Sequence, residues 1–266
     1  MNIIGIMVVK NEDIFIEQVI LNVLDFVTKI IVLDNGSEDN TVDIVKNLCR
    51  LYKNISLANI PDCLDTLSYI QEYVGTNSWL FLVDGDEIFD PSGLNKLRKK
   101  LKSGKYKKYW KLQGYYFHCC YLDQKRKQAK GFFGPPSKVG SKLTNLSLVK
   151  EWRPDGKTVL THPSPVFKEK KQPLAKKIQL ESVWETCMFR CLHTRFIKRS
   201  TLDYKEEKYC DGRFNPSDIL KVNSEEFILD ESLKELYVKD YRKKYRLGKI
   251  SKIKTNEFFK KKKKIL

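Results

Sequence analysis

One stretch constrains the fold more than any other. Five apolar residues at 79–83 run directly into Asp84, Gly85, Asp86 and Glu87. The apolar run is too short to span a membrane and predicts a buried β-strand. Open α/β sheets keep their ligand sites at the carboxyl ends of the strands, which is where these acids fall. Because the three carboxylates repel one another, the stretch predicts a cation or a donor-rich ligand between them. A solvated acidic turn is the alternative.

Upstream of this stretch, apolar runs alternate with segments of helical periodicity. We expect strands at 3–9, 29–33, 55–58 and 79–83, and helices at 14–27, 42–52 and 66–74. This β-α-β-α-β-α-β order builds a parallel sheet with right-handed crossovers. The polar loops at 10–13, 34–41 and 84–87 should therefore meet at one sheet edge and form a nucleotide site. A Rossmann dehydrogenase does not fit, because no G-x-G-x-x-G follows the first strand and no P-loop motif occurs.

The three strand ends carry distinct motifs: Val9-Lys10-Asn11-Glu12, Asp34-Asn35-Gly36-Ser37 and Asp84-Gly85-Asp86. In this order they resemble the nucleotide-sugar-binding half of family 2 glycosyltransferases, and most of all the branch whose first strand ends in K-N-E. The resemblance covers residues 3–90 well and extends thinly to about residue 210. It implies the GT-A fold, a Rossmann-like α/β architecture with a mostly parallel sheet flanked by helices.

The same resemblance suggests how the chain is divided. Residues 1–210 would form the glycosyltransferase domain, with a nucleotide-sugar-binding half at 1–90 and an acceptor half at 91–210. Residues 211–266 predict a helical, lysine-rich C-terminal extension, because amphipathic and highly charged segments replace the strand patterns there.

The resemblance implies transfer of a sugar from a nucleoside diphosphate sugar, with inversion at the anomeric carbon. Asp34 and Asn35 would reach the base or the ribose of the donor, and Val9, Asn11 and Glu12 would line the same pocket. Asn35 stands where many relatives have a second Asp, and uracil is the base we expect first.

The acids after the fourth strand form the expected metal site. The resemblance implies that Asp84 contacts the ribose or a metal-bound water, and that Asp86 ligates the Mn²⁺ or Mg²⁺ that bridges the diphosphate. Such an ion neutralises the leaving diphosphate as the bond breaks. Gly85 lets the backbone turn tightly and approach a ligand, while Glu87 would orient the loop. His193 resembles the late histidine that completes the metal site in several enzymes of this fold, and a structural histidine is the alternative.

The acceptor half supplies fewer signals. An inverting transfer needs a general base for the acceptor hydroxyl. We expect Glu185 in this role, with other acidic candidates at Glu181, Asp123 and Asp155. Basic residues interrupted by Gly and Pro at 123–142 predict a loop that closes over the diphosphate or holds an anionic acceptor. Within that loop, Lys138 is the expected contact with the nucleotide sugar.

The charge balance leaves alternatives open. The chain has 50 Lys and Arg against 33 Asp and Glu, a net charge of +17, which favours phosphorylated substrates, anionic membranes or polyanions. A basic nucleic-acid-binding protein is one alternative, but no nucleic-acid module is recognised and we expect no nucleic acid. A nucleotidyltransferase with the same metal site is another. The expected partners are a nucleotide-sugar donor, a glycan or lipid-linked saccharide acceptor and, through five lysines at 260–264, an anionic membrane surface.

The cysteines bear on the compartment. There are seven, an odd number, and the apolar start at 3–9 lacks the basic residues and cleavage site of a secretory signal. Free thiols in the reducing cytoplasm are the simplest account. A zinc site is not favoured because the candidate ligands lack a C-x2-C pair; these are Cys187, Cys191, His193 and Cys210.

Overall fold

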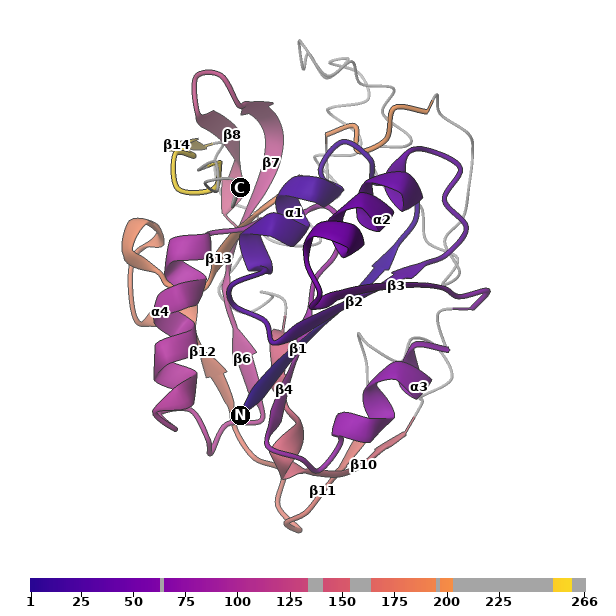
Figure 1. Ribbon diagram of the computed structural model, residues 1–266. Coiled ribbons are helices and arrows are strands. Elements are labelled where there is room, and N and C mark those ends of the chain that lie inside the picture. The colour runs from indigo at the N-terminus through magenta and orange to yellow at the C-terminus, as the bar shows by residue number, and fades with distance from the viewer. Residues whose placement is uncertain (63–64, 134–140, 154–163, 195–196, 203–250, 260–266) are drawn as a thin grey trace, which may run out of the picture.

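Figure 1 shows a computed structural model of the chain. The structure describes residues 1–62, 65–133, 141–153, 164–194, 197–202 and 251–259. Lys138, most of the predicted C-terminal extension and its lysine run lie outside these residues. None of the helices within them combines the length and the apolar character that a membrane crossing requires.

A seven-stranded sheet forms the centre of the fold. In sheet order its strands are β12 (Ala175–Lys177), β6 (Lys111–Gln113), β9 (Ser141–Asn145), β4 (Ser78–Leu82), β1 (Asn2–Val9), β2 (Lys29–Asp34) and β3 (Ile55–Asn59). The four strands from β4 to β3 run parallel. β9 runs antiparallel to both of its neighbours, β4 and β6. The predicted mostly parallel sheet, and with it the α/β fold class, is confirmed.

Helices cover both faces of this sheet (Figure 1). They are α1 (Ile16–Val23), α2 (Thr41–Leu51), α3 (Thr66–Ile70), its continuation η2 (Gln71–Tyr73) and α4 (Pro91–Lys102). The alternation along β1 explains the two layers. Ile3 and Met7 enter a core cluster with α1, α2 and α4, whereas Ile4 and Ile6 enter a second cluster with Ile70 of α3. A strand that is buried on both faces has a continuous apolar sequence, as residues 3–9 do.

A second sheet of five strands lies beside the first. In sheet order it contains β14 (Ser251–Lys254), β8 (Gln128–Phe133), β7 (Tyr115–Asp123), β13 (Arg190–His193) and β5 (Glu87–Phe89). β13 is parallel to β7 and antiparallel to β5, and His193 is in register with both His118 and Glu87. Three strands that are distant in sequence thus bring these residues side by side.

Two expectations for the chain after residue 90 need correction. The basic stretch 123–142 is not one loop, because 128–133 form β8 and 141–145 form β9. The extension is not helical at 251–254, because these residues form β14 and pair with β8. Phe258 follows β14 and is buried against Trp184, with ring centroids 5.9 Å apart. The pairing of β14 and the burial of Phe258 therefore hold residues 251–259 against the second sheet.

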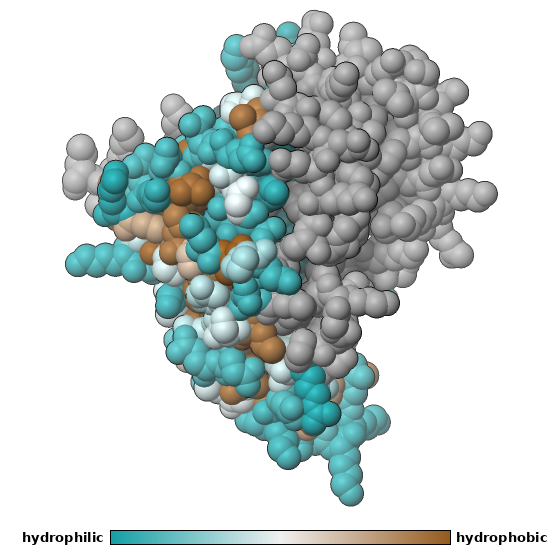
Figure 2. Space-filling view, turned by 90° about the vertical axis from the view of Figure 1, so that its right-hand side faces the viewer, coloured by the Kyte–Doolittle hydropathy of each residue, from teal (hydrophilic) through white to brown (hydrophobic). Residues whose placement is uncertain are grey.

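The remaining elements are short. β10 (Val149–Arg153) and β11 (Ser164–Phe167) form a two-stranded sheet, and the other 3-10 helices are η3 (Leu146–Leu148), η4 (Ile178–Leu180) and η5 (Trp184–Thr186). Figure 2 shows the side of the molecule that carries β3 and α3, where the described surface is mostly hydrophilic with scattered apolar residues. Scattered apolar side chains are normal for a protein surface and do not mark a docking site.

Candidate functional site

The loops after β1 and β2 meet at the carboxyl edge of the main sheet. The Asn11 backbone N–H donates to Ser37 Oγ at 3.0 Å, and the Glu12 N–H donates to Thr41 Oγ1 at 2.7 Å. The Asn11 side chain returns the contact by accepting from the Glu38 N–H at 2.8 Å. The predicted convergence of these two loops is confirmed.

Asp34 ends β2 at this edge and is buried. Its Oδ2 accepts from the backbone N–H groups of Gly36 and Ser37 at 3.1 and 3.0 Å, which closes a turn. Gly36 has a φ of +78°, a conformation that glycine adopts without strain. Asp34 Oδ1 is buried and has no hydrogen-bond partner among the described residues. A buried acceptor without a partner is costly, so this oxygen suits a ligand that donates a hydrogen bond.

Asn35 follows Asp34 and forms hydrogen bonds with Val9 and with the segment after β3. The Asn35 side-chain amide donates to the carbonyl oxygens of Ile60 and Pro61 at 3.0 and 3.3 Å, and its backbone N–H donates to Val9 O at 2.9 Å. Asn35 therefore uses its amide N–H groups to hold the segment after β3.

Glu12 lies between Arg199 and the turn at Gly85. Its carboxylate is buried and accepts from Arg199 Nη1 at 2.8 Å. A Cβ added at Gly85 would lie 2.7 Å from Glu12 Cγ. The turn at Gly85 thus approaches the Glu12 side chain closely. Glu12 packs against the acidic turn at 84–87 and, through its contact with Arg199, connects that turn to the segment after β13.

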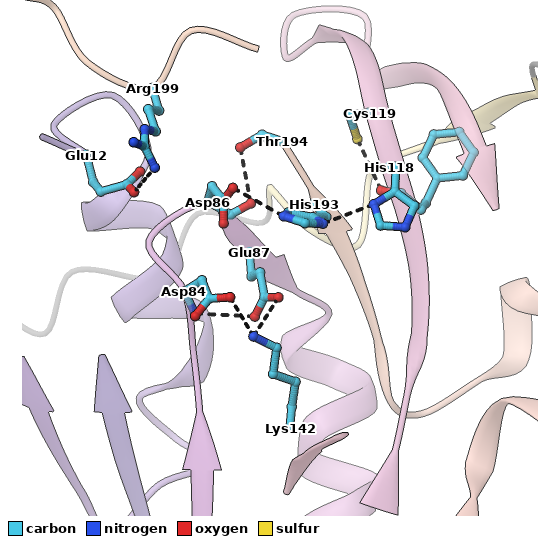
Figure 3. Close-up of polar contacts among 11 residues, drawn as sticks. Glu12, Asp84, Asp86, Glu87, His118, Cys119, Lys142, His193, Thr194 and Arg199 are labelled. Carbon is cyan, nitrogen blue, oxygen red and sulfur yellow. Dashed lines mark hydrogen bonds and ion pairs between the residues drawn. The ribbon is translucent and has the colours of Figure 1, made fainter. Parts of the chain in front are cut away.

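Lys142 of β9 lies between two of the acids that follow β4 (Figure 3). Its Nζ is 2.6 Å from Asp84 Oδ2 and 2.9 Å from Glu87 Oε1. Burial raises the pKa of Glu87 to about 7, although the Lys142 ammonium opposes that shift. Burial alone would lower the pKa of Lys142, but Asp84 and Glu87 outweigh burial and raise it. Glu87 Oε2 also accepts from the Asp84 N–H at 3.3 Å, so Glu87 orients the turn as expected.

Asp86 faces the histidines of the second sheet (Figure 3). Its Oδ2 is 3.2 Å from His193 Nε2, and His193 Nδ1 is 3.0 Å from His118 Nδ1. Thr194 fixes the backbone of Asp86 by donating to its carbonyl from N–H at 2.8 Å and from Oγ1 at 3.1 Å. The structure therefore brings Asp86 and His193 together, as predicted, although they are far apart in sequence.

Sequence reasoning missed Lys142 as a partner of the acids and His118 as a partner of His193. One signal for His118 was available, since the chain has only three histidines and two of them meet here. Lys142 carried no distinguishing signal among the basic residues around it.

Glu185 and the cysteines lie apart from this group. Glu185 is exposed in η5, next to Trp184, whose carbonyl accepts from Arg190 Nη1 at 2.8 Å. Arg190 begins β13 and His193 ends it, so Glu185 lies toward the far end of that strand from Asp86. The cysteines in the described part of the chain are free thiols. No group of three or more His, Cys, Asp or Glu side chains in that part is arranged to hold a metal ion.

Comparison with known proteins gives a family match. The sequence matches the profile described as Glycosyl transferase family 2 over residues 6–203. A search of curated proteins gives no match.

Solved structures overlap only in part. Glucosyl-3-phosphoglycerate synthase from Mycobacterium tuberculosis, in complex with Mn²⁺, UDP-glucose and phosphoglyceric acid, is 20% identical, with 44% of each chain covered and a TM-score of 0.33. A mannosyltransferase from Pyrobaculum calidifontis, in complex with GDP-mannose and Mn²⁺, is 14% identical, with 42% of this chain and 35% of that chain covered and a TM-score of 0.34. The match thus spans less than half of the length of either protein, and the family match is the stronger finding.

Proposed function

The chain belongs to glycosyl transferase family 2, and we propose that it transfers a sugar from a nucleoside diphosphate sugar, with UDP as the expected nucleotide, in a divalent-metal-dependent reaction that inverts the anomeric carbon. The observation that carries this proposal is the pairing of Asp86 with His193 at the carboxyl edge of a parallel sheet.

The donor set suits Mn²⁺ or Mg²⁺. Asp86 Oδ2 and His193 Nε2 lie 3.2 Å apart, and two adjacent ligands of an octahedral ion at about 2.1 Å lie roughly 3 Å apart. A carboxylate and an imidazole suit Mn²⁺, and a carboxylate with substrate phosphates suits Mg²⁺. Asp86 and His193 would hold the ion, which would neutralise the charge of the departing diphosphate.

The other residues bind and orient the donor in this proposal. Asp34 Oδ1, which has no hydrogen-bond partner in the described part of the chain, would accept a hydrogen bond from the base or the ribose. Asp84 keeps more than half of its side chain exposed while it contacts Lys142, so it can accept from a ribose hydroxyl or a bound water. Lys142 holds Asp84 and Glu87 in place and offsets their charge near the expected diphosphate.

The remaining features of the proposal concern the acceptor and the setting. We propose a glycan or a lipid-linked saccharide as acceptor, with Glu185 as the general base. Free thiols support the cytoplasm as the compartment, with the lysine run at 260–264 contacting an anionic membrane surface.

The proposal is tested by titrating the protein with UDP and UDP-sugars in the presence of Mn²⁺, followed by analysis of slow donor hydrolysis. We expect Mn²⁺-dependent binding and release of UDP, and Asp86→Asn should abolish both while the fold is kept. Absence of binding by any nucleotide sugar, with or without metal, would refute the proposal. Release of pyrophosphate would show nucleotidyl transfer instead.

A further inference from the structure

His118 is placed beside His193 by strand register. β7 and β13 are parallel, and their pairing aligns these two residues. Tyr116 packs against both imidazoles, with ring centroids 6.1 Å from His118 and 5.9 Å from His193. On the neighbouring strand β8, a Cβ added at Gly131 would overlap the backbone oxygen of His118. The backbone and the ring of His118 are therefore both confined.

The hydrogen bonds around His193 follow from donor and acceptor chemistry. Without a metal, the Asp86 carboxylate can only accept, so His193 Nε2 donates to it across 3.2 Å. A neutral His193 then has a lone pair on Nδ1, and His118 Nδ1 must donate across 3.0 Å. If His193 held a metal ion, its Nε2 lone pair would be needed for the ion and its proton would have to lie on Nδ1, which would reverse this order. His118 Nδ1 must then accept.

We propose that His118 is a positioning residue for the metal site. Its Nδ1 holds the imidazole of His193 with Nε2 directed at Asp86, both before and after metal binding. An imidazole suits both states, because its two tautomers turn Nδ1 from a donor into an acceptor without a net change of charge. This inference rests on the proposed function, because it assumes that Asp86 and His193 hold the ion.

The first test measures Mn²⁺ affinity in the presence of UDP, by electron paramagnetic resonance of free Mn²⁺. His118→Phe keeps a ring against Tyr116 but removes the nitrogen that contacts His193. Loss of such a supporting hydrogen bond weakens metal affinity by about 10–100-fold, and we expect a loss in that range. His118→Asn places an amide near the position of Nδ1 and should recover much of the affinity.

A matched control lies on the same strand. Tyr121 donates to Asp123 Oδ2 at 3.3 Å, away from His193, so Tyr121→Phe should bind Mn²⁺ like the wild type. His118→Phe with wild-type affinity would overturn the inference while leaving the proposed function intact. A wild type that binds no Mn²⁺ with UDP would overturn the metal site itself, and this inference with it.

A second measurement needs no variant. Long-range ¹⁵N–¹H correlation spectra of the wild type report the tautomer of each histidine. Without metal we expect the proton on His193 Nε2 and on His118 Nδ1. With Mg²⁺ and UDP we expect it on His193 Nδ1 and on His118 Nε2. Unchanged tautomers in a complex shown to contain Mg²⁺ would refute the role of His118.

Discussion

Replacing Lys142 by Met removes the ammonium group that contacts the buried Glu87 carboxylate. Glu87 is 1% exposed, and Lys142 Nζ lies 2.9 Å from its Oε1. Breaking a buried ion pair by removing one partner costs about 3–5 kcal/mol, because a charge is left without compensation. Asp84 adds less than about 1 kcal/mol, since more than half of its side chain is exposed. We expect Lys142→Met to lower the free energy of unfolding by about 3 kcal/mol.

A second lysine provides the matched control. Lys176 Nζ lies 2.5 Å from Glu181 Oε1, and about a third of each side chain is exposed. Lys176→Met should therefore cost at most about 1 kcal/mol. Both variants are measured by urea unfolding followed by tryptophan fluorescence, in EDTA at pH 8, where Glu87 of the wild type is mostly ionised.

The double variant Lys142→Met/Glu87→Gln separates the lost pair from lost packing. Removing both charges leaves no uncompensated carboxylate, so it should recover about 2 kcal/mol of the loss. The reasoning is refuted if Lys142→Met costs no more than Lys176→Met, because Glu87 would then not depend on the ammonium.

Three further predictions concern the neighbouring residues. Arg199→Met should lower the free energy of unfolding by about 3–5 kcal/mol, because the buried Glu12 carboxylate loses its ion pair with the Arg199 guanidinium; urea unfolding would detect this, and a cost below 1 kcal/mol would contradict it. Gly85→Ala should cost about 1–3 kcal/mol by the same assay, because the new Cβ meets Glu12 Cγ at 2.7 Å; an unchanged midpoint would show that Glu12 moves freely. Glu185→Gln should lower kcat for sugar transfer by about 10²–10⁴-fold if it is the general base, and a wild-type kcat would assign that role elsewhere.

The fold of residues 1–90 was predictable because its information is local. Along β1, Ile3 and Met7 alternate with Ile4 and Ile6, and both sets are buried, so the apolar run itself specified a strand covered on both faces. Parallel strands with crossover helices then allow few topologies. The polar residues after each strand had to share one edge, which is why the convergence of the loops that carry Asn11 and Ser37 followed from the sequence.

The rest of the site depends on long-range register, which no local pattern reports. β9 enters the main sheet antiparallel between β4 and β6, and only this insertion brings Lys142 to Asp84, 58 positions away in the chain. His118 meets His193 through pairing of β7 with β13, across 75 positions. A shift of one residue in either strand would turn these side chains to the opposite face. His193 was predicted from a family resemblance, whereas no comparable feature of the sequence pointed to His118 as its partner.

The partners of the acidic residues differ in one chemical respect that decides where a divalent ion fits. Arg199 contacts Glu12, and Lys142 contacts Asp84 and Glu87. A guanidinium or an ammonium has no lone pair to offer a metal, so each compensates its carboxylate and keeps a second cation away. Asp86 instead faces the imidazole of His193, a group that can become a metal ligand itself. Of Glu12, Asp84, Asp86 and Glu87, three thus contact a resident cation, and Asp86 faces a group with the ligand chemistry that Mn²⁺ prefers.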